Sequence, residues 1–266
     1  MYRLLCLDID GTLLNSKHQI TKQVKTTIQR ASANGCLVVL VSARMPKGIR
    51  FLQNELAIKA PIICYSGALI VDESATDTYQ NIISVENVTT IWKAAQKANM
   101  HLSLYKDDTW YIENLDEWAQ QESDITQIKP QVIDYETLLL KWKAEATGPN
   151  KLLCMAKPEQ INQFIPLIQT SDLTIYRSKP TYLEIGSLLA SKTAAIKHIA
   201  QRLDIPTSAI ICIGDNYNDI DMLKFAGLGI AMGNAPDDVK KQAKKVTSTN
   251  DEDGVALAIQ KYYFEE

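Results

Sequence analysis

The stretch at residues 4–14 constrains the fold more than any other part of this sequence. Its apolar run at 4–7 is typical of a strand buried on both faces of a parallel sheet. That run leads directly into Asp8 and Asp10, two carboxylates that resist burial unless a cation or a polar pocket receives them. Gly11 permits a sharp turn after them. We therefore expect a carboxylate pair at the carboxyl end of a parallel strand, where open α/β sheets bind ligands; a solvated acidic turn is the alternative for these residues alone.

Strands and helices alternate on both sides of a long middle segment. Apolar runs at 37–41, 61–65 and 209–213 predict buried strands, and each ends in small polar residues. Thr21 is placed to cap a helix before the first of these strands, and Pro46 suits the first turn of a helix after it. This alternation favours a parallel sheet, so we expect an α/β fold with a three-layer, Rossmann-like core.

The middle segment has a different pattern. Strand-like runs at 101–105 and 109–113 flank a tight turn, which predicts an antiparallel hairpin. A second strand pair is expected at 173–177 and 182–185. Mixed patterning of this kind indicates an α+β domain inserted into the first one. The predicted domains are a core at 1–82 and 187–266 and an inserted domain at 83–186.

Composition argues against several classes of function. The sequence is 46% hydrophobic and 22% charged, with a net charge of −3, and it has no basic block that would bind nucleic acid. No apolar run is long enough to predict a membrane span, and the first run, which ends at Asp8, is too short for a signal peptide. The five cysteines are scattered through apolar runs, which predicts buried thiols in a cytoplasmic protein.

Polar residues of several kinds follow the predicted strands or begin the helices beside them. In a parallel sheet these positions meet at one edge. Several carboxylates with one lysine call for a hard cation with oxygen ligands, which predicts Mg²⁺, and no histidine or cysteine is placed to make a zinc site. The residues concerned are Asp8, Asp10, Ser42, Lys192, Asp215, Asn218 and Asp219.

Such a site suits phosphate chemistry. Mg²⁺ and Lys192 would neutralise a phosphate group, and Ser42 would donate a hydrogen bond to it. One carboxylate would attack phosphorus, and an aspartate two residues further on would protonate the leaving alcohol and then deprotonate water. Taken singly, Lys192 could instead be a solvated helix residue, Ser42 a helix cap, and Asp219 an acidic complement to a helix N-terminus.

The motifs that carry this chemistry resemble those of the haloacid dehalogenase-like (HAD) superfamily. The run Asp8-Ile9-Asp10-Gly11-Thr12-Leu13 is similar to its first motif, and Ser42, Lys192 and Gly214–Asp219 match the second, third and fourth in order. The insertion between the second and third motifs resembles the large α/β cap, of the C2B type, found in Cof-type phosphatases. One departure is Ser66-Gly67-Ala68, where the family often has Asn-Gly-Ala, and it bears on a backbone-amide contact at that loop.

The resemblance implies a role for each catalytic or metal-binding position. Asp8 would be the nucleophile and a metal ligand. Asp10 would be the general acid and base, and it would reach the metal through its backbone carbonyl. Asp215 would bind Mg²⁺ through its side chain, and Asp219 would support the metal through its water shell.

The resemblance also implies how a phosphoryl group is held. Ser42 and the amide of Ala43 would bind it, Asn218 would contact it, and Lys192 would hold both the phosphate and the nucleophile. The expected function is Mg²⁺-dependent hydrolysis of a small phosphorylated metabolite through an aspartyl-phosphate, with sugar phosphates as the substrate class that the resemblance suggests. A phosphohexomutase of the same superfamily and a catalytically silent phosphosugar-binding protein are the alternatives.

Overall fold

The computed structural model describes residues 2–72 and 79–265, and it divides into two compact units. One contains Met1–Tyr79 and Ser191–Glu266, and we call it the core unit. The other contains Gln80–Ala190, and we call it the inserted unit. The two units have different sheets, one largely parallel and one largely antiparallel, so the expected α/β core with an inserted α+β domain is confirmed.

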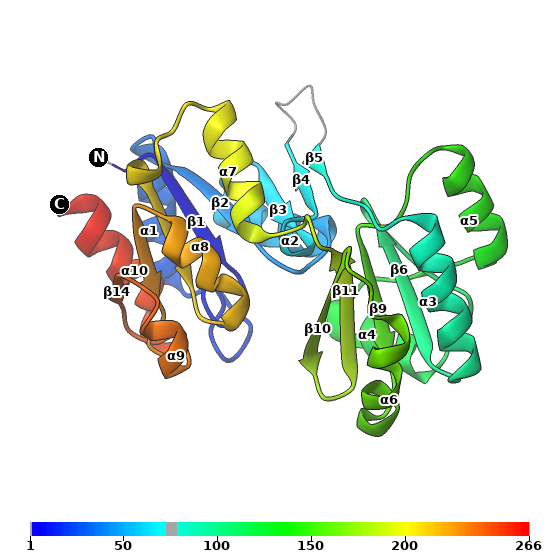
Figure 1. Ribbon diagram of the computed structural model, residues 1–266. Coiled ribbons are helices and arrows are strands. Elements are labelled where there is room, and N and C mark those ends of the chain that lie inside the picture. Colours follow the sequence, from blue (N-terminus) through cyan, green and yellow to red (C-terminus); the bar gives the residue numbers. More distant parts are fainter. Residues whose placement is uncertain (1, 73–78, 266) are drawn as a thin grey trace. The chain divides into compact units, whose positions relative to one another are not determined.

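The core unit is built on an eight-stranded sheet (Figure 1). Its described strands are β1 (Leu4–Asp8), β2 (Leu37–Val41), β3 (Ile62–Cys64), β4 (Leu69–Val71), β5 (Tyr79–Gln80), β12 (Ile210–Gly214), β13 (Leu228–Ala231) and β14 (Lys245–Val246). They lie in the order β14-β13-β12-β1-β2-β3-β4-β5, and neighbours from β14 to β3 run parallel. Because β1 lies between β12 and β2, the carboxyl ends of both neighbours flank its own.

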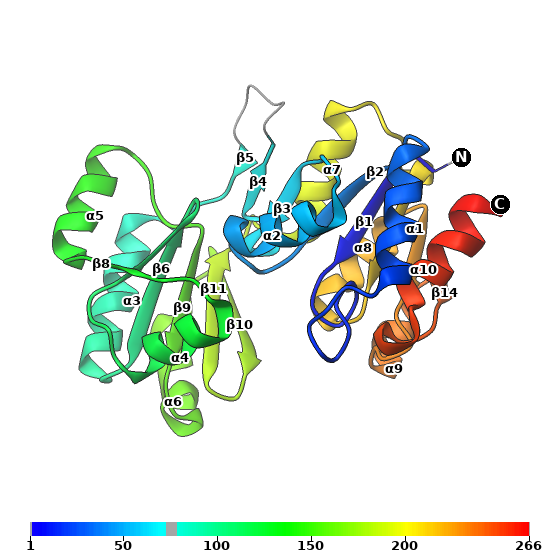
Figure 2. The same ribbon diagram turned by 180° about the vertical axis from the view of Figure 1, so that it is seen from behind.

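Helices cover both faces of this sheet and give the core unit three layers. They are α1 (Lys22–Ala33), α2 (Pro46–Leu56), α7 (Lys192–Arg202), α8 (Ile220–Phe225), α9 (Asp237–Lys240) and α10 (Gly254–Ile259). α7 and α8 lie on one face (Figure 1), and α1, α2 and α10 lie on the other (Figure 2). The predicted helix starts are confirmed, since Thr21 caps α1 and Pro46 begins α2. Among the described helices, none is both long and apolar enough to cross a bilayer.

The chain reverses direction after β3, and the pattern of apolar residues does not predict this reversal. A turn at Tyr65–Gly67 follows β3, and β4 then runs antiparallel to it. Tyr65 and Ser66 adopt left-handed backbone conformations in this turn, with φ of 51° and 55°. Nothing in the short run at 69–71 distinguishes a returning strand from the start of a helix. The expected parallel sheet is therefore mixed at this edge.

The inserted unit has a six-stranded sheet of its own. The strands are β6 (His101–Lys106), β7 (Thr109–Ile112), β8 (Gln131–Val132), β9 (Lys151–Met155), β10 (Leu173–Lys179) and β11 (Tyr182–Ser187). In the order β10-β11-β9-β6-β7-β8 they pair antiparallel, except that β7 and β8 run parallel. Both predicted strand pairs, β6 with β7 and β10 with β11, are confirmed.

One face of this second sheet carries the apolar core of the inserted unit. The helices are α3 (Val85–Lys97), α4 (Glu117–Thr126), α5 (Tyr135–Ala144) and α6 (Pro158–Ile168). Side chains from α3, α5 and α6 pack against alternate residues of β6, Leu102 and Leu104. α4 lies on the opposite face (Figures 1 and 2). Alternation along β6 therefore directs His101 and Ser103 away from the apolar core.

A network of side-chain hydrogen bonds lies on the face of the inserted sheet that α4 covers. His101 contacts Asp116 through Nδ1 at 2.8 Å and Ser103 Oγ through Nε2 at 2.7 Å. The indole N–H of Trp110 donates to the same Ser103 oxygen at 2.8 Å. A neutral imidazole with its proton on Nδ1 satisfies both of its contacts. Burial lowers the pKa of His101 below its ordinary value of 6.5, although the charges of Asp116 and Glu122 act in the opposite direction.

This buried imidazole makes the stability of the inserted unit depend on pH. Unfolded His101 takes up its proton near pH 6.5, whereas folded His101 does so only at lower pH. The contribution to stability is therefore complete above pH 6.5 and decreases as the pH falls below it. We expect the unfolding free energy in urea to decrease from pH 7 to pH 5 by more in the wild type than in His101→Gln. His18→Asn is the control variant, because His18 is exposed and belongs to the core unit rather than to this network.

Candidate active site

Three of the predicted site segments meet at one edge of the core sheet. Asp8 is the last residue of β1 and lies opposite Val41 of β2, so Ser42 follows β2 just beyond the level of Asp8. On the other side β12 ends at Gly214, and Asp215 follows it. The strands are parallel, so all three side chains lie at the carboxyl edge, as predicted.

Lys192 begins α7 and is held between two carboxylates. Its Nζ donates to Oδ1 of Asp8 at 2.5 Å and to Oδ1 of Asp219 at 2.6 Å. The Lys192 side chain is only 2% exposed, so the solvated role that it could have had is wrong. The first turn of a helix disfavours a cation, and the two carboxylates offset that cost.

A close approach of two backbone segments positions this lysine. Gly67 has a φ of +100°, and a Cβ there would lie 2.1 Å from the carbonyl oxygen of Ser191, the N-cap of α7. Only glycine permits that contact. The neighbouring N–H of Ser66 donates to the carbonyl of Ser42 at 2.9 Å. The loop at residues 66–68, which departs from the family pattern, therefore contacts both the end of β2 and the start of α7.

The turn after β1 packs directly on Asp215. The Thr12 hydroxyl donates to Oδ1 of Asp215 at 2.9 Å. Gly11 has a φ of +85°, and a Cβ there would lie 2.4 Å from Oδ2 of Asp215, so the residue must be glycine. Burial raises the pKa of Asp215 to about 6, against the hydrogen bond from Thr12, which lowers it.

Three carboxylates share a space that one ammonium group does not neutralise. Oxygens of Asp8, Asp215 and Asp219 lie within 4.8 Å of one another. Burial and the charge of Asp219 raise the pKa of Asp8 well above its ordinary value. Burial lowers the pKa of Lys192, but its two carboxylate partners raise that pKa by more, so the net shift is upward. The surplus of negative charge favours a further cation at this point.

The donor set fits a hard divalent metal ion. All of the donors are carboxylate oxygens, which Mg²⁺ prefers, usually with one or two carboxylates and several waters. Asp219 already uses Oδ1 for Lys192 and Oδ2 for the N–H groups of Asp215 and Asn216, each at 3.0 Å. The side chains of Asp8 and Asp215 are therefore the ones best placed to hold the ion, with Asp219 behind them.

Asp10 lies apart from this cluster. Its side chain is 52% exposed, and Arg44 holds both of its oxygens, with Nε at 3.0 Å from Oδ2 and Nη2 at 2.6 Å from Oδ1. Two parallel bonds of this kind fix the orientation of a carboxylate. The arrangement keeps Asp10 at the open side of the site, two residues from Asp8.

The predicted phosphate-binding residues differ in their surroundings. Ser42 is buried, and its Oγ accepts the N–H of Arg44 at 3.2 Å, so its own proton stays available for a further acceptor. Ala43 is half-buried beside it. Asn218 is exposed at the turn that follows β12. The structure therefore places all three at the carboxyl edge of the sheet.

Comparison with known proteins assigns the family. A family model described as haloacid dehalogenase-like hydrolase matches residues 5–259. The chain belongs to the haloacid dehalogenase-like hydrolases. The expected membership of the HAD superfamily is therefore confirmed.

Relatives and solved structures extend over the whole HAD chain. A protein of Haemophilus influenzae is 31% identical over 267 residues, which is 99% of each chain. A 5-amino-6-(5-phospho-D-ribitylamino)uracil phosphatase of Bacillus subtilis, YcsE, is 29% identical and covers 97% of this chain and 94% of its own. The crystal structure of a haloacid dehalogenase-like hydrolase from Bacteroides thetaiotaomicron superposes with a TM-score of 0.89 at 31% identity, over 98% of this chain and 99% of that one.

Three residues at the HAD site have contacts that the sequence did not predict. Arg44 binds Asp10, Thr12 binds Asp215, and the Asn234 amide donates to the carbonyl of Gly11 at 2.8 Å. Thr12 lies within the first motif and Arg44 lies two residues after Ser42, so their positions in the sequence already indicated that both lie near the site. No local pattern indicates the contact of Asn234 with a loop 223 residues away.

Proposed function

We propose that this chain is a cytoplasmic, Mg²⁺-dependent phosphatase that hydrolyses small phosphomonoesters, sugar phosphates in particular, through an aspartyl-phosphate on Asp8. The observation that carries the proposal is the position of Asp8, in contact with Lys192 and within 4.8 Å of two further carboxylates. A carboxylate with a cation beside it and a metal site next to it is suited to attack phosphorus.

In the first step an oxygen of Asp8 forms a bond to phosphorus while the bond from phosphorus to the ester oxygen breaks. Lys192 stabilises the negative charge of the phosphoryl oxygens, and Ser42 and Asn218 donate hydrogen bonds to them. The ion held by Asp8 and Asp215 would supply further positive charge to those oxygens. Asp10, protonated on an oxygen that Arg44 has released, gives its proton to the departing alkoxide.

In the second step Asp10, now a carboxylate, takes a proton from water. The water oxygen bonds to phosphorus, and the bond between phosphorus and Asp8 breaks. Asp8 and Asp10 return to their starting states, and inorganic phosphate leaves. Arg44 serves as a positioning residue, because it orients the Asp10 carboxylate through two hydrogen bonds.

Two observations support the choice of substrate and compartment. The relative YcsE is named for a substrate that carries a phosphorylated ribityl group, a polyol chain related to sugars. All five cysteines of this chain are free and buried, as suits a reducing compartment. These features favour a small phosphorylated sugar or polyol as substrate.

The direct test is phosphate release from a panel of phosphomonoesters, with Mg²⁺ and with a chelator. We expect release in Mg²⁺ that the chelator abolishes, with hexose and pentose phosphates ahead of nucleotides and aryl phosphates. Equal release with the chelator would contradict the metal site. A preference for aryl phosphates or nucleotides over every sugar phosphate would overturn the substrate class.

The same panel separates the two alternatives. A phosphohexomutase would convert a phosphosugar to its isomer without free phosphate. A silent binding protein would protect itself from thermal unfolding in the presence of a phosphosugar but would neither release phosphate nor form an isomer. Phosphate release in Mg²⁺ excludes both as the main activity.

Arg44 offers a separate test of how Asp10 is positioned. We expect Arg44→Met to lower kcat by on the order of 10–100-fold, because a catalytic group that loses its orientation by about 1 Å loses activity on that scale. Arg44→Lys should lose less, since it keeps the charge but not the two parallel bonds. Steady-state kinetics on the best substrate of the panel would measure both.

Arg3 supplies the control for this pair of variants. It lies before β1, at the far end of that strand from Asp8, and donates to the carbonyl of Asp204. Arg3→Met should therefore leave kcat unchanged. An unchanged kcat in Arg44→Met would show that Asp10 needs no such orientation.

A further inference from the structure

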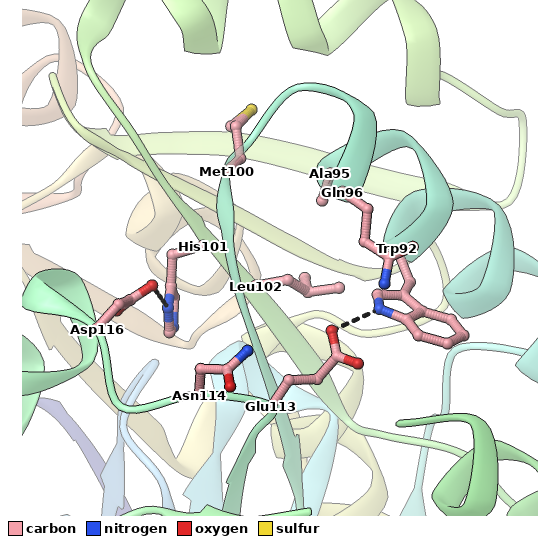
Figure 3. A pocket seen from close by; sticks show the side chains of 9 residues that line it. All are labelled: Trp92, Ala95, Gln96, Met100, His101, Leu102, Glu113, Asn114 and Asp116. Carbon is pink, nitrogen blue, oxygen red and sulfur yellow. Dashed lines mark hydrogen bonds and ion pairs between the residues drawn. The ribbon is translucent and has the colours of Figure 1, made fainter. Parts of the chain in front are cut away.

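The inserted unit contains a small cavity of its own (Figure 3), which is open to solvent beside the exposed residues Gln96, Asn114 and Asp116. Its volume is about 70 Å³, room for about two waters, and all of its lining residues belong to the inserted unit. The apolar part comes from Ala95, Met100 and Leu102. The polar part is formed by Trp92, Gln96, His101, Glu113, Asn114 and Asp116.

The charges around this cavity are of one sign. Glu113 and Asp116 are carboxylates, and none of the nine lining residues is a lysine or an arginine. His101 adds no positive charge near neutral pH, because burial lowers its pKa. Lys93 and Lys97 of the same helix line a separate depression with Leu167. An anion would therefore be repelled here, and a cation attracted.

The two carboxylates differ in how much bonding capacity they have left. Asp116 accepts the N–H of Ala119 with Oδ1 and contacts His101 with Oδ2, so both of its oxygens are used. Glu113 accepts the indole N–H of Trp92 with Oε2 at 2.7 Å. That bond fixes the carboxylate at the cavity wall (Figure 3) and leaves Oε1 to accept a further donor.

The cation that suits this wall is an organic one. Among the described residues, His101, Glu113 and Asp116 do not form a group of ligand atoms close enough to hold a metal ion. An alkylammonium group has N–H donors for Glu113 and short carbon atoms for the apolar floor. A chain of about three heavy atoms matches the available volume.

We propose that this cavity is a binding site for a short primary alkylammonium group, with Glu113 as its counter-ion and the Ala95, Met100 and Leu102 side chains around its carbon atoms. The site shares no residue with the carboxylate cluster of the core unit. The proposal does not depend on the proposed phosphatase activity.

Indole N–H signals in a ¹H–¹⁵N spectrum of the full chain test this site directly. The four tryptophans give four such signals, and Trp92→Phe identifies the one of interest. We titrate ethylammonium chloride as the probe, with sodium chloride at equal ionic strength and ethanol as the two comparisons. We expect ethylammonium alone to shift the Trp92 signal in a saturable way, with the other three signals unmoved.

Two charge-removing variants decide whether Glu113 is the counter-ion. Glu113→Gln keeps an acceptor for the Trp92 indole but removes the charge, and it should weaken the apparent affinity by on the order of tenfold or more. Glu117→Gln removes a nearby exposed charge that does not line the cavity and should bind like the wild type. A shift caused equally by sodium or ethanol, no shift at all, or equal affinity in Glu113→Gln would overturn the proposal. Each readout is independent of phosphate release.

Discussion

Asp8→Asn should abolish phosphate release while leaving the fold at least as stable as the wild type. Loss of the attacking group in covalent catalysis lowers kcat by on the order of 10⁴-fold or more. The stability of the variant should not fall in the presence of a chelator, because burial and the charges of Asp219 and Asp215 raise the pKa of Asp8. Removing its charge relieves that repulsion and still leaves Lys192 paired with Asp219.

The measurement combines phosphate release with urea unfolding in chelator. Asp221, an exposed aspartate on α8, provides the matched control, and Asp221→Asn should match the wild type in both. Residual Mg²⁺-dependent release within tenfold of the wild type would remove Asp8 from the role of nucleophile. A marked loss of stability in Asp8→Asn would instead show that its pairing with Lys192 outweighs the repulsion.

Lys192→Met should damage both activity and stability. Removing one partner of a buried ion pair leaves uncompensated charge and typically costs about 3–5 kcal/mol. Here the loss leaves Asp8, Asp215 and Asp219 without the Lys192 ammonium group, which contacts two of them. The phosphoryl oxygens also lose a positive partner, so we expect kcat to fall by on the order of 10³-fold.

Lys197→Met is the control for this variant, because Lys197 lies on the same helix but is exposed over Phe225. A second variant keeps the prediction testable if Lys192→Met does not fold. Without Lys192, Asp8 and Asp219 both lose their cationic partner. Asp219→Asn in the Lys192→Met background removes one of these two unpaired charges, and it should recover part of the unfolding free energy but no activity. Recovery of activity in that double variant would contradict the role of Lys192 at the phosphoryl group.

The core of the fold could be predicted because its signals are local. The apolar runs that became β1, β2 and β12 are each bounded by small polar residues, and the helix starts at Thr21 and Pro46 follow from capping chemistry. The strand reversal after β3 was missed, since three apolar residues carry no period. It depends on left-handed conformations at Tyr65 and Ser66, which neither residue type favours.

The inserted unit shows the same limit. Its hairpins were predictable from strand runs and tight turns, but the short parallel strand β8 was not. Gln131 and Val132 are both exposed, and two residues are too few to show an alternation of buried and exposed positions. The cavity beside Glu113 was likewise hidden, as its lining comes from α3, β6 and the loop after β7. Contacts of this kind depend on how the elements pack.

The sequence by itself determined which residue types reach the carboxyl edge of the core sheet, because strand direction and residue order decide that without any side-chain geometry. Only the tertiary structure decided how those residues pair. Lys192 meets Asp8 across 184 residues, Thr12 meets Asp215 across 203, and Arg44 takes Asp10 away from the carboxylate cluster. These pairings follow from the packing of α7 and the loops around β1. Contacts between residues so far apart in the chain cannot be predicted from local sequence patterns.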